Sequence, residues 1–331
     1  MTAAGRQPID VPGLVQRARE GQARAVARLI SLVEDASPVL REVAAALAPH
    51  TGRAQVIGLT GAPGVGKSTS MSALVSAYRA HEVRIGVLAV DPSSPFSGGA
   101  LLGDRVRMQE HATDDGVFIR SMASRGHLGG LAWATPQALR VLDAAGCDVI
   151  FVETVDVGQA EVEIAALADT TVLLLAPGMG DGIQAAKAGV IEIADVFVVN
   201  KADRDGADQT VRDLRYMLSL GGPHSAAGAW RPEIVRTVAV RAEGVADVIA
   251  AIDKHCAWMA GNGELDRRRR ARAAAEIEAI AVSAMREQFR DVHGSASLDK
   301  LAAEVAAGTT DPYAAADRLV GELADDRGPQ V

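Results

Sequence analysis

The chain is poor in the features that mark secreted, membrane-spanning and nucleic-acid-binding proteins. Its 331 residues include only two cysteines, Cys147 and Cys256, which cannot form a disulfide framework and fit a reducing compartment. The formal net charge is −8, and no cluster of aromatic and basic residues offers a surface for single-stranded nucleic acid. No apolar stretch could span a membrane without meeting a charge or a breaker, and the N-terminus has no signal- or transit-peptide pattern. We therefore expect a cytoplasmic protein that binds neither nucleic acid nor membrane.

What the chain does contain is abundant apolar residues in an ordered alternation. Hydrophobic residues make up 48% of the sequence, which is enough for a substantial core, and the length predicts about two domains. From residue 55 to about 252, short β-rich apolar runs alternate with amphipathic segments. This pattern predicts an α/β fold with a mostly parallel sheet covered by helices on both faces. The expected strands are 55–60, 84–90, 117–120, 148–152, 171–176, 195–199 and 234–239.

Residues 1–50 are expected to form a helical extension ahead of this α/β region. Asp10 can cap a helix, Pro12 suits its first turn, and apolar residues follow at approximately helical spacing. The Ala-Ser-Pro sequence at 36–38 breaks the run before a second helix. The extension would pack on the α/β region, for which we predict the boundaries 51–260.

Residues 261–331 are expected to form a C-terminal helical arm. The Gly-Asn-Gly sequence at 261–263 is a linker signal, and a charged, alanine-rich helix is predicted from Glu264 to about Gln288, followed by two further helices. The four arginines 267–270 are most simply a solvated helix face. Because the arm lacks an obvious core of its own, it fits a subunit contact better than a catalytic module.

The strongest motif is the sequence GAPGVGKS at Gly61–Ser68, which follows the apolar run 56–60. It fits the template G-x-x-x-x-G-K-[ST] with a strand before it and a helix after it. Its glycines let several backbone N–H groups point at one spot, where Lys67 and the helix start add positive potential. A triphosphate fits that spot, and the Ser68 hydroxyl can reach a magnesium ion. The candidate phosphate-binding residues are Gly61, Ala62, Pro63, Gly64, Val65, Gly66, Lys67, Ser68 and Thr69.

A second motif, Asn200-Lys201-Ala202-Asp203, follows the expected strand 195–199 and matches N-K-x-D. The Asp203 carboxylate can accept hydrogen bonds from both the ring N–H and the exocyclic amine of guanine, and Lys201 can lie over the base. Such polar pairing can reject a wrong base by a factor on the order of 10⁴. Ala239, at the end of the last expected strand, can complete the base pocket through its backbone N–H; an ordinary strand end is the alternative.

Three carboxylates compete for the magnesium region, namely Asp91, Asp104 and Glu153. Magnesium prefers oxygen ligands in octahedral geometry and is usually held by one or two carboxylates, phosphate and water. Asp91 can instead be a turn residue before a proline, and Asp104 can instead cap the segment 105–110. The Pro-, Ser- and Gly-rich loop at 92–99 has the breakers of a switch segment.

Five motifs occur in an order and spacing that resemble the ArgK/MeaB family of P-loop GTPases, the bacterial counterparts of the human methylmalonic aciduria type A protein. The resemblance extends over nearly the whole chain. The motifs are the loop Gly61–Ser68, Val90-Asp91-Pro92-Ser93-Ser94-Pro95, Arg120-Ser121-Met122-Ala123-Ser124-Arg125-Gly126, Glu153-Thr154-Val155 with Val157-Gly158-Gln159, and Asn200-Lys201-Ala202-Asp203.

This resemblance implies a SIMIBI-type P-loop fold with N-terminal helices and a C-terminal dimerisation arm. It further implies a homodimeric GTPase that binds GTP and GDP with Mg²⁺, acts as a chaperone of methylmalonyl-CoA mutase, gates delivery of adenosylcobalamin and protects the mutase. The implied catalytic residues are Lys67, Glu153 and Gln159, the implied magnesium ligands are Ser68, Asp91, Asp104 and Glu153, and the implied guanine ligands are Asn200, Lys201 and Asp203.

Other positions resemble family features without a settled role. The segment 178–187 resembles the family's additional switch, in which Lys187 can also be a plain surface lysine. Arg125 and His127 lie in a Gly-rich loop that could approach the phosphates. Gln159 resembles the water-orienting glutamine of other GTPases in kind but not in offset.

One position departs from the family pattern. The family has E-T-V-G-V-G-Q where this chain has Asp156 in place of the first glycine. That glycine contacts the γ-phosphate through its backbone N–H, and a carboxylate at short range from the phosphate is repulsive. We predict a weakened response to GTP relative to GDP and impaired hydrolysis or switching.

Three alternative functions stay open on the residues alone. A small-molecule kinase shares the phosphate loop, but it generally takes ATP and needs an acceptor site that the sequence does not reveal. A nickel-inserting GTPase calls for a His- or Cys-rich cluster, whereas the seven histidines here are scattered. A nucleotide-dependent binding module with unimportant turnover is the third, and Asp156 favours it.

Overall fold

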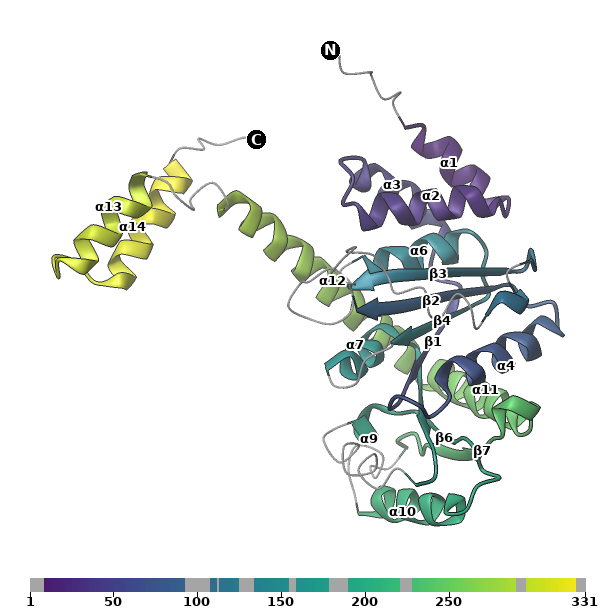
Figure 1. Cartoon of the computed structure of the whole chain (residues 1–331). Coiled ribbons are helices and arrows are strands. Elements are labelled where there is room, and N and C mark those ends of the chain that lie inside the picture. The colour runs from purple at the N-terminus through teal and green to yellow at the C-terminus, as the bar shows by residue number, and fades with distance from the viewer. Residues whose placement is uncertain are drawn as a thin grey trace. The chain divides into compact units, whose positions relative to one another are not determined.

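The structure is a computed structural model that describes residues 9–92, 108–111, 113–124, 134–154, 159–178, 190–220, 228–289 and 296–325. The chain divides into two compact units, residues 1–270 and residues 271–331. The first unit contains a seven-stranded sheet flanked by helices (Figure 1). None of the described helices combines the length and hydropathy needed to cross a membrane.

The expected parallel α/β sheet is confirmed. Its order is β3-β2-β4-β1-β5-β6-β7, and every pair of neighbouring strands is parallel. Because the strands are parallel, their carboxyl ends lie at the same edge of the sheet. The strands are β1 (Gln55–Thr60), β2 (Ile85–Pro92), β3 (Val117–Ser124), β4 (Val149–Thr154), β5 (Thr170–Leu175), β6 (Val196–Val199) and β7 (Glu233–Arg236).

All seven predicted strands exist, and the differences lie at their ends. β2 and β3 run on to Pro92 and Ser124 because they pair with each other over that whole length. β7 stops at Arg236, whereas the apolar pattern predicts a strand to residue 239. The chain turns there into the short helix η4 (Ala239–Arg241), so the last apolar residues of the pattern belong to a turn.

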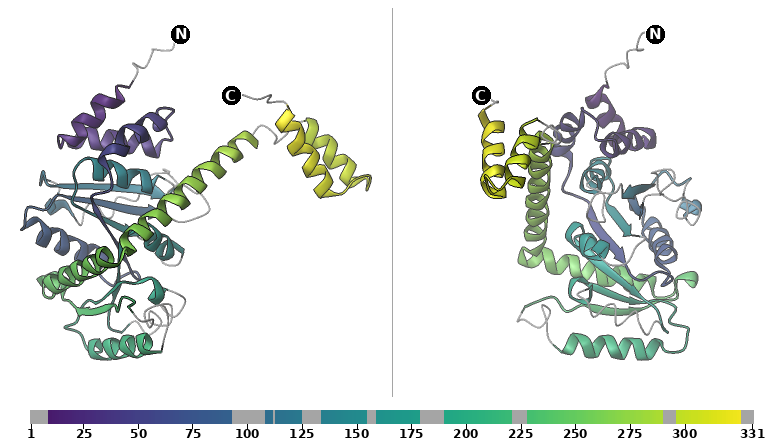
Figure 2. Two further views of the ribbon diagram at one scale, coloured as in Figure 1. Left: turned by 180° about the vertical axis from the view of Figure 1, so that it is seen from behind. Right: turned by 60° about the vertical axis from the view of Figure 1, so that its left-hand side comes forward.

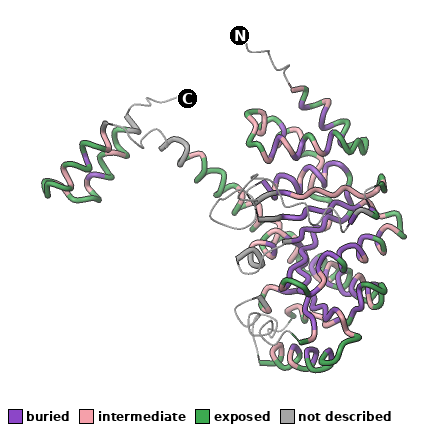
Figure 3. Tube along the Cα trace, in the orientation of Figure 1, coloured by how far each residue is buried: buried purple, intermediate pink, exposed green. Residues whose placement is uncertain are grey.

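Helices cover both faces of the sheet. Because successive side chains of a strand point to opposite faces, a hydrophobic core forms on each face. On one face, α4 (Lys67–Arg79) and α11 (Val245–Asn262) pack on residues such as Ile57, Phe151 and Val172. Figure 2 shows these two helices side by side. The other face carries α6 (Thr135–Ala144), α7 (Gln159–Leu167), α9 (Val190–Ile193) and α10 (Ala207–Ser219). Burial is accordingly concentrated along the strands (Figure 3).

The N-terminal helices are α1 (Val11–Arg19), α2 (Ala23–Glu34) and α3 (Leu40–Leu47), followed by the short helix η1 (Ala48–His50). The expected cap is confirmed, since the Gly13 N–H donates to Asp10 Oδ1 at 2.9 Å. The first apolar run forms two helices rather than one, because the chain reverses at Gly21, whose φ is +84°. Their apolar faces join the core over α6, so the extension packs on the sheet domain as predicted.

The linker expected at residues 261–263 is wrong. α11 continues to Asn262, and only Gly263, with a φ of +75°, separates it from α12 (Glu264–Phe289). A glycine in the left-handed region ends one helix and lets the next begin at once. In the second unit, α13 (Ala296–Ala306) and α14 (Pro312–Asp325) pack on each other, burying Leu301 and Ala315.

Candidate functional site

The predicted site residues follow the carboxyl ends of neighbouring strands. β4, β1, β5, β6 and β7 are consecutive in the sheet. The phosphate loop follows β1, Glu153 lies near the end of β4, and Asn200 follows β6. An open parallel sheet binds its ligand in the crevice beyond these strand ends. The sheet order therefore brings motifs more than a hundred residues apart to one edge.

The glycines of the phosphate loop have backbone conformations that other residues rarely adopt, and two of them leave no room for a Cβ. Gly61, Gly64 and Gly66 have φ values of +146°, +80° and +98°. A Cβ on Gly61 would lie 2.3 Å from the Leu174 carbonyl oxygen of β5. A Cβ on Gly66 would lie 2.5 Å from Asn200 Nδ2. The loop thus lies directly against β5 and against Asn200, which follows β6.

Lys67 and Ser68 open α4 and are both buried. Lys67 Nζ donates to the carbonyl oxygen of Gly61 at 2.7 Å, so the ammonium group lies inside the curve of its own loop. Ser68 Oγ donates to Glu153 Oε1 at 3.2 Å. The loop lysine, the hydroxyl and the carboxylate expected around a metal-bound triphosphate are therefore assembled in one place.

The second motif contacts the phosphate loop directly. Asn200 Nδ2 donates to the Val65 carbonyl oxygen at 2.8 Å, and Lys201 Nζ donates to the Gly64 carbonyl oxygen at 2.6 Å. Lys201 has a φ of +55°, a left-handed conformation that is uncommon for a residue with a side chain. These hydrogen bonds join the loop predicted to bind the phosphates to the loop predicted to bind the base.

The Asn200 amide is also held from the far side. Its Oδ1 accepts hydrogen bonds from Thr237 Oγ1 and from the Ala239 N–H, both at 3.1 Å. The Ala239 N–H, expected to face the base, is thus directed at Asn200 in this structure. Asn200 consequently joins the phosphate loop to the chain after β7, and no sequence motif indicated the contact with Thr237.

Asp203 is half exposed, and its Oδ2 lies 3.4 Å from Arg241 Nη1 of η4. Arg241 also pairs with Glu243, with 2.7 Å between Nε and Oε1. The hydrogen bonds and charge of Glu243, joined by Asp203, raise the pKa of the Arg241 guanidinium. Sequence motifs did not indicate Arg241, because its partner Asp203 lies 38 residues earlier in the chain.

Several predicted residues are outside what the structure describes. Asp104, Asp156, Arg125, His127 and Lys187 fall in undescribed segments. Asp91 lies near the end of β2 and Gln159 begins α7, but their side chains are not described. Their roles stay predictions.

The expectation that residues 267–270 form a solvated helix face is wrong for two of the four arginines. Arg268 donates to Asp195 from both terminal nitrogens at 2.9 Å, and Arg269 Nη2 donates to Asp169 Oδ2 at 2.9 Å. The two carboxylates are buried at the starts of β6 and β5. Four consecutive residues cover every face of a helix, so two of them must face inward when a helix packs on a sheet.

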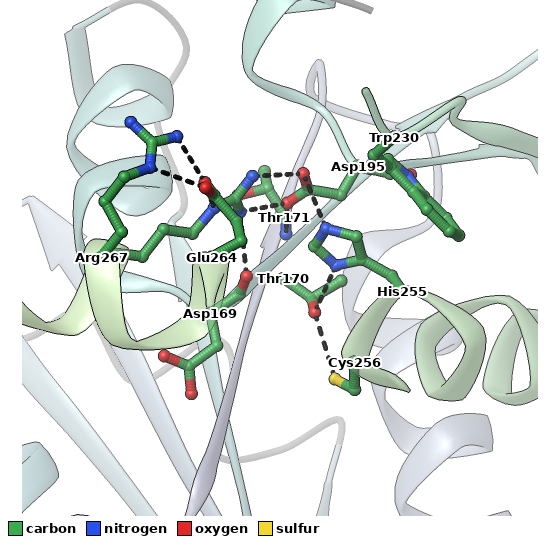
Figure 4. Close-up of polar contacts among 10 residues, drawn as sticks. Asp169, Thr170, Thr171, Asp195, Trp230, His255, Cys256, Glu264 and Arg267 are labelled. Carbon is green, nitrogen blue, oxygen red and sulfur yellow. Dashed lines mark hydrogen bonds and ion pairs between the residues drawn. The ribbon is translucent and has the colours of Figure 1, made fainter. Parts of the chain in front are cut away.

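Asp195 is the centre of a larger network at this edge of the sheet, opposite the carboxyl ends (Figure 4). Its Oδ2 accepts the Thr171 N–H at 2.8 Å, and its Oδ1 lies 3.2 Å from Nε2 of the fully buried His255. The Trp230 indole donates to the Asp195 carbonyl oxygen at 2.7 Å. Burial alone would raise the pKa of the Asp195 carboxyl, but the hydrogen bonds from His255 and Arg268 outweigh it and hold the pKa below its usual range.

Comparison with known proteins places most of this chain in one family. Residues 26–293 match the family described as "Methylmalonyl Co-A mutase-associated GTPase MeaB". A Pyrococcus abyssi protein whose name places it among the GTPases is 47% identical over 310 residues, which covers 94% of this chain and 96% of that protein.

Two further comparisons extend this result. The mouse protein named methylmalonic aciduria type A homolog, mitochondrial, is 36% identical over 268 residues, covering 76% of this chain and 64% of that protein. A solved structure described as LAO/AO transport system kinase shares the fold, with a TM-score of 0.70 and 24% identity over 96% of this chain and 100% of that one. The family match and the level of identity together show that the chain is a GTPase of the MeaB family.

Proposed function

We propose that this GTPase binds guanine nucleotides at the carboxyl edge of its sheet, with Gly61–Ser68 around the phosphates and Asn200, Lys201 and Asp203 around the base. The observation that carries the proposal is the pair of hydrogen bonds from Asn200 and Lys201 to the phosphate loop. A nucleotide lying along both loops would contact one loop with its base and the other with its phosphates, and hydrogen bonds already hold these two loops together.

A magnesium ion fits the donors in this site. Ser68 Oγ and Glu153 Oε1 are hard oxygen donors 3.2 Å apart, and both residues are buried beside the phosphate loop. Asp91 and Asp104 remain proposed ligands from the sequence. When bound, the ion would neutralise phosphate charge, which is the usual contribution of magnesium to phosphoryl transfer. Lys67 would exchange its contact with the Gly61 carbonyl oxygen for the phosphates.

Nucleotide titration tests the site. We expect Lys67→Ala to lose GDP binding, because it removes the ammonium group that lies inside the curve of the phosphate loop. We expect Asp203→Asn to weaken GDP and to favour xanthosine diphosphate, because an amide can donate to the 2-oxo group that replaces the guanine amine. Fluorescence titration with labelled nucleotides measures both. Unchanged GDP affinity in Asp203→Asn would remove the proposed base site.

We further propose that the protein is a chaperone of adenosylcobalamin-dependent methylmalonyl-CoA mutase, gating cofactor delivery and protecting the enzyme. The family description and the name of the mouse relative support this client. The test is to mix the two proteins and to measure complex formation by size-exclusion chromatography and GTP turnover with and without the mutase. A complex with faster turnover is expected. The absence of a complex would overturn the chaperone proposal and leave the GTPase.

We also propose that the C-terminal arm joins two copies of the chain. Ile277 and Ile280 lie on one face of α12, at 68% and 49% exposure, and Val282 and Met285 are exposed further along the helix. Apolar side chains of this size on a helix surface favour burial against a partner. Light scattering of the full chain should give a dimer, and the double variant Ile277→Asp, Ile280→Asp should give a monomer. A monomeric parent would contradict the proposal.

A further inference from the structure

The short loop after β7 places a cation beside the carboxylate proposed to read guanine. Arg241 Nη1 lies 3.4 Å from Asp203 Oδ2. The Asp203 side chain is 41% exposed and the Arg241 side chain 51% exposed, so both are open to a ligand that approaches from solvent. Arg241 follows Ala239 within the same turn of η4, and the Ala239 N–H holds the Asn200 amide. The arginine therefore belongs to the turn that borders the base site.

The guanidinium is held in place by its own loop. Arg241 Nε donates to Glu243 Oε1 at 2.7 Å and Nη2 donates to Glu243 Oε2 at 3.3 Å, which is a two-point contact. The loop is closed by a bridge between Val238 and Glu243, with Ala242 at a φ of +55°. Gly244 permits the closure, because a Cβ there would lie 2.1 Å from the Arg236 carbonyl oxygen. Glu243 thus fixes the direction from which Arg241 reaches Asp203.

We propose that Arg241 is a positioning residue for guanine selectivity, which orients the Asp203 carboxylate toward the ring N–H and exocyclic amine of the base. The inference rests on the proposed guanine-reading role of Asp203. A carboxylate offers about four lone-pair sites on its two oxygens. One contact from Arg241 at Oδ2 leaves sites for the two donors of guanine. A half-exposed aspartate otherwise loses rotamer freedom when the base binds, and that loss weakens binding.

The opposite role makes a different prediction. If Arg241 blocked the carboxylate, guanine would have to displace it, and removal of the guanidinium would tighten nucleotide binding. If Arg241 only supported the loop, its removal would weaken every nucleotide by the same factor. Selectivity for the 2-amino group distinguishes these cases, because inosine diphosphate lacks that amine and keeps the ring N–H.

The experiment measures GDP and inosine diphosphate affinities of the full-length protein at fixed ionic strength. We expect Arg241→Ala to weaken GDP by about two- to fivefold, the range for exposed ion pairs, and to weaken inosine diphosphate less. Arg241→Lys should recover part of the difference, because it keeps the charge without the two-point contact. Arg236→Ala is the matched control: its side chain is equally exposed, at 51%, and pairs with Asp208 rather than with Asp203. It should leave both affinities unchanged.

Three results would overturn the inference. They are unchanged or tighter GDP binding in Arg241→Ala, an equal loss for both nucleotides, and an effect of the same size in Arg236→Ala. Asp203→Asn separates this inference from the proposed base site. If Asp203→Asn loses GDP and Arg241→Ala does not, only the role of Arg241 fails. If Asp203→Asn binds GDP normally, both fail. In the Asp203→Asn background, Arg241→Ala should have no further effect on selectivity.

Discussion

Replacing Asp195 by asparagine removes the charge at the centre of the network that holds the start of α12. Asp195 is 2% exposed and accepts two hydrogen bonds from Arg268 and one from the Thr171 N–H. Asparagine keeps the size of the side chain but directs an NH₂ group at donors and leaves Arg268 with Glu264 as its remaining ion-pair partner. Removing one partner of a buried ion pair typically costs about 3–5 kcal/mol.

We expect the lower end of that range, about 3 kcal/mol, because the Arg268 side chain keeps 30% of its solvent exposure. For a unit of this size, each kcal/mol of lost stability lowers the thermal midpoint by about 2–4 °C, so a loss of about 3 kcal/mol should lower it by roughly 6–12 °C. Circular dichroism at pH 7 measures it. The control is Asp208→Asn, whose pair with Arg236 is exposed and should be worth about 1 kcal/mol or less.

Two results would refute the reasoning. The first is a midpoint for Asp195→Asn no lower than that of the Asp208→Asn control. The second comes from the background Arg268→Met, which lacks the partly buried cation, so Asp195→Asn should cost clearly less there. An equal cost in both backgrounds would mean that the charge of Arg268 is not what Asp195 stabilises.

Three further predictions follow from single residues. In thermal scans, the difference in stability between the parent and Asp195→Asn should narrow as the pH falls below about 4. A carboxyl whose pKa is lowered by folding stabilises the folded state above its unfolded pKa and loses that effect when it is protonated. A constant difference would contradict this. Gly61→Ala should cost about 1–3 kcal/mol of strain and weaken GDP in titrations, because its Cβ would lie 2.3 Å from the Leu174 carbonyl oxygen; the control Gly308→Ala, also at positive φ but in open space, should bind GDP normally. Asp156→Gly should strengthen GTP relative to GDP and raise turnover in a phosphate-release assay, because it removes a negative charge proposed to face the γ-phosphate; equal values for parent and variant would refute that role.

The strands and both loop motifs could be predicted because their signals are local. An apolar run such as Val149–Val152, which follows turn residues, indicates a buried strand whatever its neighbours are. The phosphate loop is contiguous, and its glycines are needed at fixed positions within eight residues. Even the Asp10 cap and the chain break at residues 36–38 depend only on residues a few positions away.

The errors occurred where a residue's role depends on a distant partner. The arginines at 267–270 form a charged run, and nothing in their neighbourhood distinguishes Arg268 from Arg267. The distinction arises because β5 and β6 lie side by side and present Asp169 and Asp195 to the start of α12. Likewise, Gly263 ends α11, and α12 begins at the next residue. Only the structure shows that no linker lies between these two helices.

The sequence by itself therefore determined the order of the strands along the chain, the parallel α/β class and the positions of the two loop motifs predicted to bind nucleotide, because hydrogen-bond periodicity and loop geometry act over a few residues. The tertiary structure decided which separate segments meet. It joined Asn200 to Val65, Arg241 to Asp203 and Arg268 to Asp195. These contacts depend on the order of strands in the sheet and on where each connecting segment brings the chain back to the sheet.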